Sequence, residues 1–354
     1  PGDELARAGN LTYVANRNRP NVDRFFDAMR DRASTIDGLL IRSVNHRTCR
    51  RLWLSNSTDP GAVDWPTRIG AAARDRYAVP HIVSGDKALA GQDAWMTALV
   101  GVRNEVSDLL DGAAIANTDA PTALPPASVE SLVDAYAQAA GRRAATRSDD
   151  EEMLLNAWRE SQERVVDFQA RGSSLDLTST GDLAGRISQI GAYLGSGLCR
   201  CASMILPYFY DTHYGDESHP KALDGAFGAM MAIDRLLQQT PGTNAPTLAD
   251  ETVVVVYSEM GRTPYLTVAD GREHWMFTSC VLWGPGVRGG QQIGGYDDDM
   301  VGIPVDLASG RTSPDHGVQL APDVVGSTLL RVAGVDPAAS LGADTSVTAL
   351  LADA

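Results

Sequence analysis

The residues best suited to chemistry are carboxylates and histidines that follow apolar runs. Asp211 and His213 follow one apolar segment, Glu259 follows the β-branched run 252–257, and His274 lies in the polar stretch after it. Carboxylate oxygens and imidazole nitrogens bind divalent cations, and a bound cation can polarise an ester and lower the pKa of water. The set therefore predicts a metal site for Zn²⁺, Mn²⁺, Ca²⁺ or Mg²⁺. Separate helix caps and surface ion pairs are the alternative.

The spacing of Asp211 and His213 suits convergence on one group, because alternate residues of an extended segment face the same side. The apolar runs 252–257 and 278–283 predict strands. A β-branched run without polar alternation is typical of a strand buried on both faces of a parallel sheet. Functional groups gather beyond the carboxyl ends of such strands. We therefore expect the candidate ligands at one sheet edge.

Three basic residues are candidates for contact with an anionic substrate. His46 follows the predicted strand 38–44, while Arg262 and Arg272 flank the loop before His274. Guanidinium and imidazole groups stabilise anionic oxygens through charge-assisted hydrogen bonds. We predict that His46, Arg262 and Arg272 steady the substrate or its transition state. A surface turn with ordinary caps is the alternative for the His46 segment.

The order of predicted elements indicates an α/β fold. A strand at 38–44, a helix at 65–76 and a strand at 80–85 form the βαβ pattern of a parallel sheet. We predict a doubly wound, mostly parallel sheet with helices on both faces, within one domain at 1–354. A mainly helical insertion is expected at about 86–180. The role of its block 128–171, as lid, dimer interface or filler, stays open.

Composition narrows the classes of partner. The chain has 354 residues, 44% of them hydrophobic, and a net charge of −15. This charge argues against nucleic acid and anionic membranes as partners. No apolar run approaches the roughly 18–20 residues of a transmembrane helix. We expect a small anionic ester or a protein as partner, and a homo-oligomer stays open.

Several motifs together resemble the bacterial DUF1501 family. They are Asp211-Thr212-His213, the segment 250–264, Gly271-Arg272-Glu273-His274-Trp275 and the segment 282–290. That family is similar to the sulfatase and alkaline phosphatase superfamily. The resemblance implies an alkaline phosphatase-like α/β fold and hydrolysis of phosphate or sulfate esters with bound divalent metal. It also implies a periplasmic or secreted protein, since the family often carries a twin-arginine export signal.

Two departures from the superfamily support a second hypothesis. Met260 stands where the enzymes carry an Asp-His pair after the strand. Their nucleophile and first metal-binding Asp lie on the first strand, whereas residues 1–20 are polar and are predicted to be irregular. We expect that motif upstream of Pro1 or absent. The first hypothesis is therefore a secreted or periplasmic metal-dependent hydrolase, and the second is a catalytically degenerate binding or structural assembly subunit.

Overall fold

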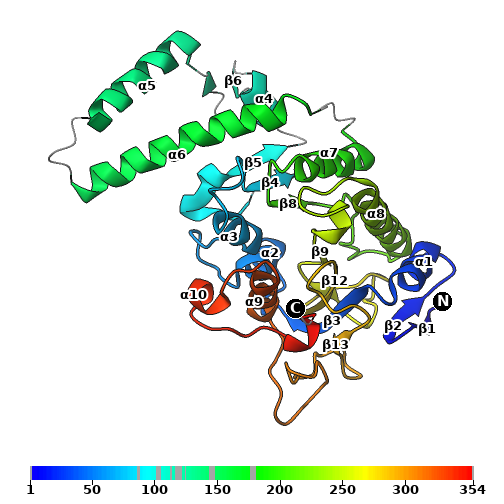
Figure 1. Cartoon of the computed structure of the whole chain (residues 1–354). Coiled ribbons are helices and arrows are strands. Elements are labelled where there is room, and N and C mark those ends of the chain that lie inside the picture. Colours follow the sequence, from blue (N-terminus) through cyan, green and yellow to red (C-terminus); the bar gives the residue numbers. More distant parts are fainter. Residues whose placement is uncertain are drawn as a thin grey trace. The chain divides into compact units, whose positions relative to one another are not determined.

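The computed structural model of the chain divides into two compact units (Figure 1). The first contains Pro1–Ile69, Leu89–Gln92 and Leu206–Ala354, and the second contains Gly70–Ala88 and Asp93–Ile205. The structure describes residues 2–85, 88–100, 105–111, 114–115, 122–123, 125–142, 148–175 and 181–352. All seven predicted site residues belong to the first unit.

The first unit is built on a four-stranded mixed sheet with the order β13-β3-β12-β9. Its strands are β3 (Ala33–Leu40), β9 (Val254–Tyr257), β12 (Phe277–Trp283) and β13 (Gln292–Gly294). β13 is parallel to β3, whereas β12 is antiparallel to both of its neighbours. Here the structure differs from the predicted mostly parallel sheet.

The direction of β12 follows from its connection to β9. Only loops and the short hairpin of β10 (Gly261–Arg262) and β11 (His274–Trp275) separate the two strands. A parallel neighbour would need a long crossover, usually through a helix, so β12 returns antiparallel. β9 pairs only with β12 among the described strands and is half-buried. It is therefore an edge strand, although its alternate residues pack against the cores on both faces of the sheet, as the β-branched run predicts.

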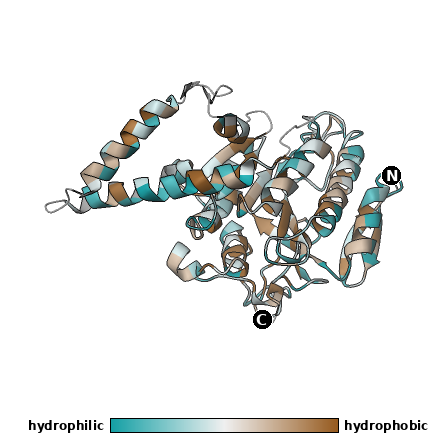
Figure 2. Ribbon diagram, turned by 45° about the horizontal axis from the view of Figure 1, so that its top comes forward, coloured by the Kyte–Doolittle hydropathy of each residue, from teal (hydrophilic) through white to brown (hydrophobic). Residues whose placement is uncertain are grey.

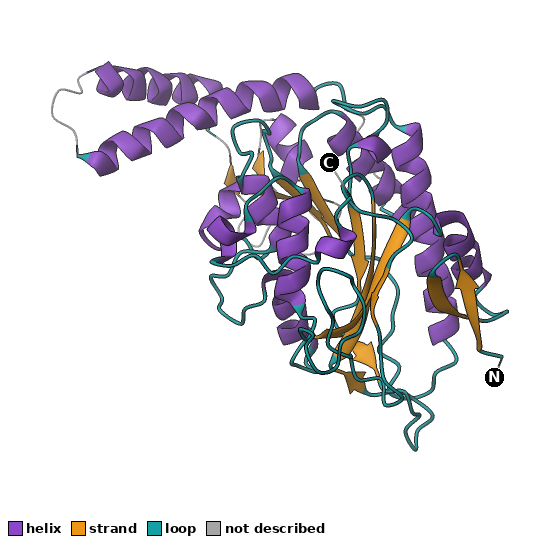
Figure 3. Cartoon of the chain, turned by 60° about the horizontal axis from the view of Figure 1, so that its bottom comes forward, coloured by secondary structure: helices purple, strands orange, loops and turns teal. Residues whose placement is uncertain are grey.

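Helices cover both faces of this sheet (Figures 1 and 3). On one face, α1 (Pro20–Met29) and α8 (His219–Gln239) enclose a core with Phe25, Met230 and Trp283. On the other, α2 (His46–Ser55) and α9 (Pro322–Val332) enclose a core with Trp53, Val325 and Leu282. Alternate residues of β12 thus enter opposite cores. The strands of this central sheet are among the most apolar elements in Figure 2.

The start of the chain is more regular than its polar sequence suggests. β1 (Glu4–Ala8) and β2 (Leu11–Ala15) form an antiparallel hairpin around Gly9. Gly9 has a φ of +62°, which glycine adopts without steric cost. Leu11 is fully buried beside Phe26 of α1 in the core, so tertiary packing stabilises the hairpin. The prediction that residues 1–20 are irregular is wrong for these strands.

The second unit holds a parallel sheet and most of the predicted insertion. β4 (His81–Ser84) lies between β5 (Thr97–Val100) and β8 (Cys201–Met204), parallel to both. Its helices are α4 (Glu105–Asp111), α5 (Ala127–Arg142), α6 (Asp149–Gly172) and α7 (Leu183–Gly195), and β6 (Ala114–Ile115) pairs with β7 (Thr122–Ala123). His81 is buried, and its Nε2 lies 2.8 Å from the hydroxyl of Ser203.

Two short α-helices remain, besides the 3-10 helices η1 (Gly91–Met96), η2 (Leu248–Asp250) and η3 (Thr348–Leu350). α3 (Trp65–Ala71) begins in the first unit, where the buried Trp65 donates to the carbonyl of Trp53. α10 (Pro337–Leu341) follows α9 and is capped by Asp336. Among the described helices, none is both long and apolar enough to cross a membrane.

Candidate metal centre

Four segments of the first unit bring the candidate residues together. His46 is the first residue of α2, directly after the N-cap Asn45, whose side chain accepts from the backbone N–H of Thr48. Glu259 follows the end of β9. His274 lies opposite Arg262 in the β10–β11 hairpin. The fourth segment carries Asp211 and His213, and its Thr212 carbonyl accepts from the backbone N–H of Arg272.

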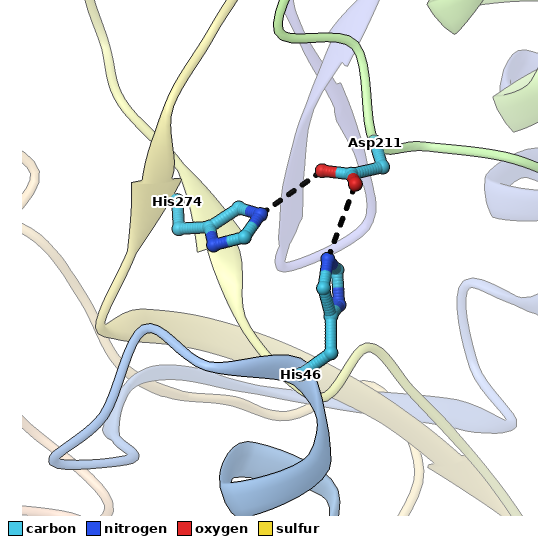
Figure 4. A group of neighbouring side chains, drawn as sticks. All are labelled: His46, Asp211 and His274. Atoms are coloured by element: carbon cyan, nitrogen blue, oxygen red, sulfur yellow. Dashed lines mark hydrogen bonds and ion pairs between the residues drawn. The ribbon is translucent and has the colours of Figure 1, made fainter.

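Asp211 lies at the centre of the cluster. Its Oδ1 is 2.9 Å from Nε2 of His213, 2.9 Å from Nε2 of His274 and 2.6 Å from Nη2 of Arg262. Its Oδ2 is 3.3 Å from Nε2 of His46. Three histidines thus present the same ring nitrogen to one carboxylate, and Figure 4 shows His46 and His274 converging on Asp211.

The other ring nitrogen of each histidine, Nδ1, lies within hydrogen-bond distance of an oxygen acceptor. Nδ1 of His46 lies 2.7 Å from Oε1 of Glu259, and Nδ1 of His213 lies 2.9 Å from Oε2 of Glu273. Nδ1 of His274 lies 2.5 Å from the backbone carbonyl of Val44. All three partners are acceptors, so each Nδ1 carries a proton and donates. A neutral imidazole in this state presents a lone pair at Nε2.

The facing nitrogens limit the number of protons in the cluster. Nε2 of His213 and Nε2 of His274 are 3.0 Å apart. Two N–H groups cannot point at each other across this distance, so at least one of these nitrogens presents a lone pair toward Asp211. A lone pair close to a carboxylate is unfavourable unless a proton or a cation lies nearby. Imidazoles held through Nδ1 by a carboxylate or a carbonyl are typical of metal-binding histidines.

Three of the residues satisfy the distances for a common metal ion. Ligand atoms of His46, Asp211 and His274 all lie within 4.8 Å of one another, and all three residues are partly exposed. His213 lies outside this group but brings a third nitrogen close to Asp211 and His274, at the distances given above. We predicted Asp211, His213 and His274 as ligands, and the structure places them together. It also places His46 among them, where we predicted contact with substrate instead.

Glu259 has a different place from the one we predicted. Its carboxylate contacts Nδ1 of His46, on the side of the ring that faces away from Asp211. It therefore orients a histidine of the cluster instead of joining the common ligand group. Met260, next in the chain, is 4% exposed and packs into the core beneath α2 and α9. Its position after Glu259 thus has a structural explanation.

The two predicted anion-binding arginines are engaged within the fold. Arg262 contacts Asp211 through Nη2 and donates through Nη1 to the carbonyl of Arg272, 3.2 Å away. Arg272 donates to Asp216 at 3.1 Å and to the carbonyl of Thr263 at 2.9 Å. Both guanidinium groups therefore tie the loop between β10 and β11 to the segment that carries Asp211.

The surroundings of Asp211 keep its carboxyl group ionised. Burial by itself would raise the pKa of Asp211, but hydrogen bonds from His274 and Arg262 and the charge of Arg262 outweigh it. The pKa of Asp211 consequently lies well below its usual value of 3.8. Asp211 is thus ionised at neutral pH and can serve there as an anionic ligand.

Sequence reasoning missed two acceptors that complete the cluster. Glu273 directly precedes His274, but its partner is His213, on a segment some 60 residues earlier in the chain. The position of Glu273 beside the candidate ligand His274 was the one signal in the sequence that could have pointed to this acceptor. Val44 acts through its backbone carbonyl, so its side chain carried no signal at all.

The comparisons with known proteins bear on the segment that carries most of this cluster. Residues 199–307 match the DUF1501 family model. Its description is "Protein of unknown function". The DUF1501 match includes Asp211, His213, Glu259, Arg262, Arg272 and His274, whereas His46 lies outside it. Neither the curated proteins nor the solved structures contain a match to the chain.

Proposed function

We propose that this protein is a metal-dependent hydrolase of phosphate or sulfate esters, exported to the periplasm or secreted. The observation that carries the proposal is the convergence of three Nε2 atoms on Asp211, each ring being held through Nδ1. The resemblance to the sulfatase and alkaline phosphatase superfamily supplies the reaction class and the location. An alkaline phosphatase-like fold belongs to the same proposal.

The donor set favours particular ions among the four considered. His46, His213 and His274 offer imidazole nitrogens, and Asp211 offers a carboxylate. Zn²⁺ and Mn²⁺ accept such mixed sets, whereas Ca²⁺ and Mg²⁺ prefer oxygen ligands throughout. When bound, an ion of this kind polarises the ester and lowers the pKa of a water molecule. Glu259 and Glu273 orient two of the rings, and Arg262 orients Asp211.

The experiment combines metal analysis with turnover. The purified protein is supplied with Zn²⁺ or Mn²⁺, assayed for bound metal, and tested with an aryl phosphate and an aryl sulfate. We expect bound metal and turnover, both lost in Asp211→Ala and His274→Ala. His316→Ala is the matched control, because His316 is exposed and takes no part in the cluster. Metal-free, inactive wild-type protein would favour a degenerate binding or assembly subunit instead.

A further inference from the structure

An arginine that contacts the substrate beside the metal ion has to be one other than the two we first predicted. Arg262 is paired with Asp211 and Arg272 with Asp216, and the Arg262 side chain is only 11% exposed. The carboxylate partner of each arginine largely neutralises its charge. Beside a bound metal ion, an anionic ester at the cluster would gain further from a cationic side chain whose charge is not already paired.

A strongly basic segment adjoins the cluster. Residues 38–58 contain four arginines and no Asp or Glu, although the chain as a whole carries a net charge of −15. The segment runs from the end of β3 into α2 and includes both Val44, which holds His274, and His46. Basic charge is thus concentrated on the segment that supplies one side of the site.

Two arginines of this segment are exposed and have no carboxylate partner among the described residues. They are Arg42 and Arg47. Arg51 donates to the carbonyl of Asp59 instead, and Arg50 has interactions of its own. Arg47 directly follows His46 in the first turn of α2, a turn without an acidic residue. The positive end of the helix dipole repels a cation there, so the position is unfavourable unless an anion lies close by.

The backbone conformation of Arg42, in the segment before α2 begins, is also unfavourable. Its φ is +61°, in the left-handed region that a residue with a side chain seldom adopts. This conformation turns the chain two residues after β3 ends, before Val44 and His46 reach the cluster. Backbone conformations of this kind persist where the surrounding structure holds them, often at functional sites.

We propose that Arg47, together with Arg42, binds the anionic oxygens of the ester substrate beside His46. The inference rests on the proposed function, because it assigns the anion-binding group of that same site. A guanidinium provides two parallel donors to a phosphate or sulfate group, and an arginine without a carboxylate partner has both available. Arg262 and Arg272 are then residues that position Asp211 and its loop.

The test measures binding of inorganic phosphate and, separately, inorganic sulfate by calorimetry on the metal-supplemented full chain. We expect Arg47→Gln to weaken binding of the anion about tenfold or more, as for loss of a hydrogen bond between charged groups. Arg42→Gln should have a smaller effect, and the double variant should also flatten the dependence of binding on salt. Arg47→Lys should bind the anion more tightly than Arg47→Gln but less tightly than wild type, because lysine keeps the charge but lacks the two parallel N–H donors of the guanidinium.

The controls separate this inference from the proposed function. Arg7→Gln removes an exposed arginine of β1 and should leave anion binding unchanged. Metal content should stay at the wild-type level in Arg42→Gln and Arg47→Gln, since neither residue belongs to the ligand group. Metal binding and turnover that persist while both variants bind anion like wild type would overturn the inference alone. A wild type that binds neither metal nor anion would overturn both proposals.

Discussion

Oε1 of Glu259 lies 2.7 Å from Nδ1 of His46, and the opposite edge of the same ring faces Asp211. The carboxylate therefore selects the ring orientation and the tautomer of a histidine that belongs to another element, α2. Glu273 does the same for His213. Acceptors behind metal-binding histidines raise the basicity of the ligand and reduce its freedom to rotate.

Removing the Glu259 carboxylate that accepts from His46 should weaken metal binding, although it removes no metal ligand. We expect Glu259→Ala to reduce affinity for Zn²⁺ about 10–100-fold, the usual effect of losing an acceptor behind a ligating histidine. Glu259→Gln should lose less, since its amide oxygen still accepts from Nδ1. Titration against a chromogenic chelator measures the affinity. Glu4→Ala, on the exposed side of β1, is the control, and equal affinities for all variants would contradict this role for Glu259.

Gly271 allows the loop before His274 to pass close to the segment of His213. A Cβ at this position would collide with the backbone carbonyls of His213 and Thr212. We therefore expect Gly271→Ala to separate the two segments, to destabilise the fold by about 1–3 kcal/mol and to abolish tight metal binding. Urea unfolding and metal titration test this. Gly61→Ala, where a Cβ meets only a side-chain oxygen at 3.5 Å, should behave like wild type.

Arg262 joins Asp211 to the carbonyl of Arg272, so its loss should reduce the stability of the site. We expect Arg262→Met to lower the free energy of unfolding by about 2 kcal/mol, the scale of a hydrogen bond to a charged group. Arg262→Lys should restore little, because one ammonium cannot reach both acceptors in the geometry of the guanidinium fork. Chemical denaturation of the metal-free protein isolates this effect, and an unchanged midpoint would exclude it.

Asp344 should make stability depend on pH in the acidic range. Burial tends to raise its pKa, but hydrogen bonds from Ser346 and Ser327 and the ion pair with Arg331 hold the pKa of Asp344 well below 3.8. A carboxyl with a lowered pKa stabilises the fold fully above its unfolded-state pKa, and this stabilisation falls as the pH drops below about 4. The folded state therefore gains from Asp344 at neutral pH and loses that gain in acid.

The corresponding variant is Asp344→Asn. We expect it to be less stable than wild type by about 1–3 kcal/mol at pH 7 and at pH 5. The difference should shrink by pH 3, because the wild type loses its advantage there. Urea unfolding at the three pH values measures it. A deficit that stays constant down to pH 3 would mean that ionisation of Asp344 does not contribute.

Local patterns in the sequence were sufficient to locate several parts of the site. Asp211 and His213 are two residues apart, and their side chains lie together as their spacing led us to expect, although the chain turns at Asp211 and is not a strand there. The β-branched run before Glu259 and the apolar run 278–283 correspond to β9 and β12. The clustering of apolar residues on α1 and α8 likewise follows from helical periodicity.

Pairing between distant segments required the tertiary structure. The antiparallel return of β12 depends on how the chain after β9 crosses the sheet, which residue periodicity does not encode. Whether Glu259 binds a metal or supports His46, and whether Arg262 meets a substrate or Asp211, depends on contacts across 213 and 51 residues of chain. The types of residue in the sequence determined which chemistry is available at this site. Only the packing of α2, β9, the β10–β11 hairpin and the Asp211 segment decided which residue takes which role, because a side chain's role depends on its nearest neighbours in space.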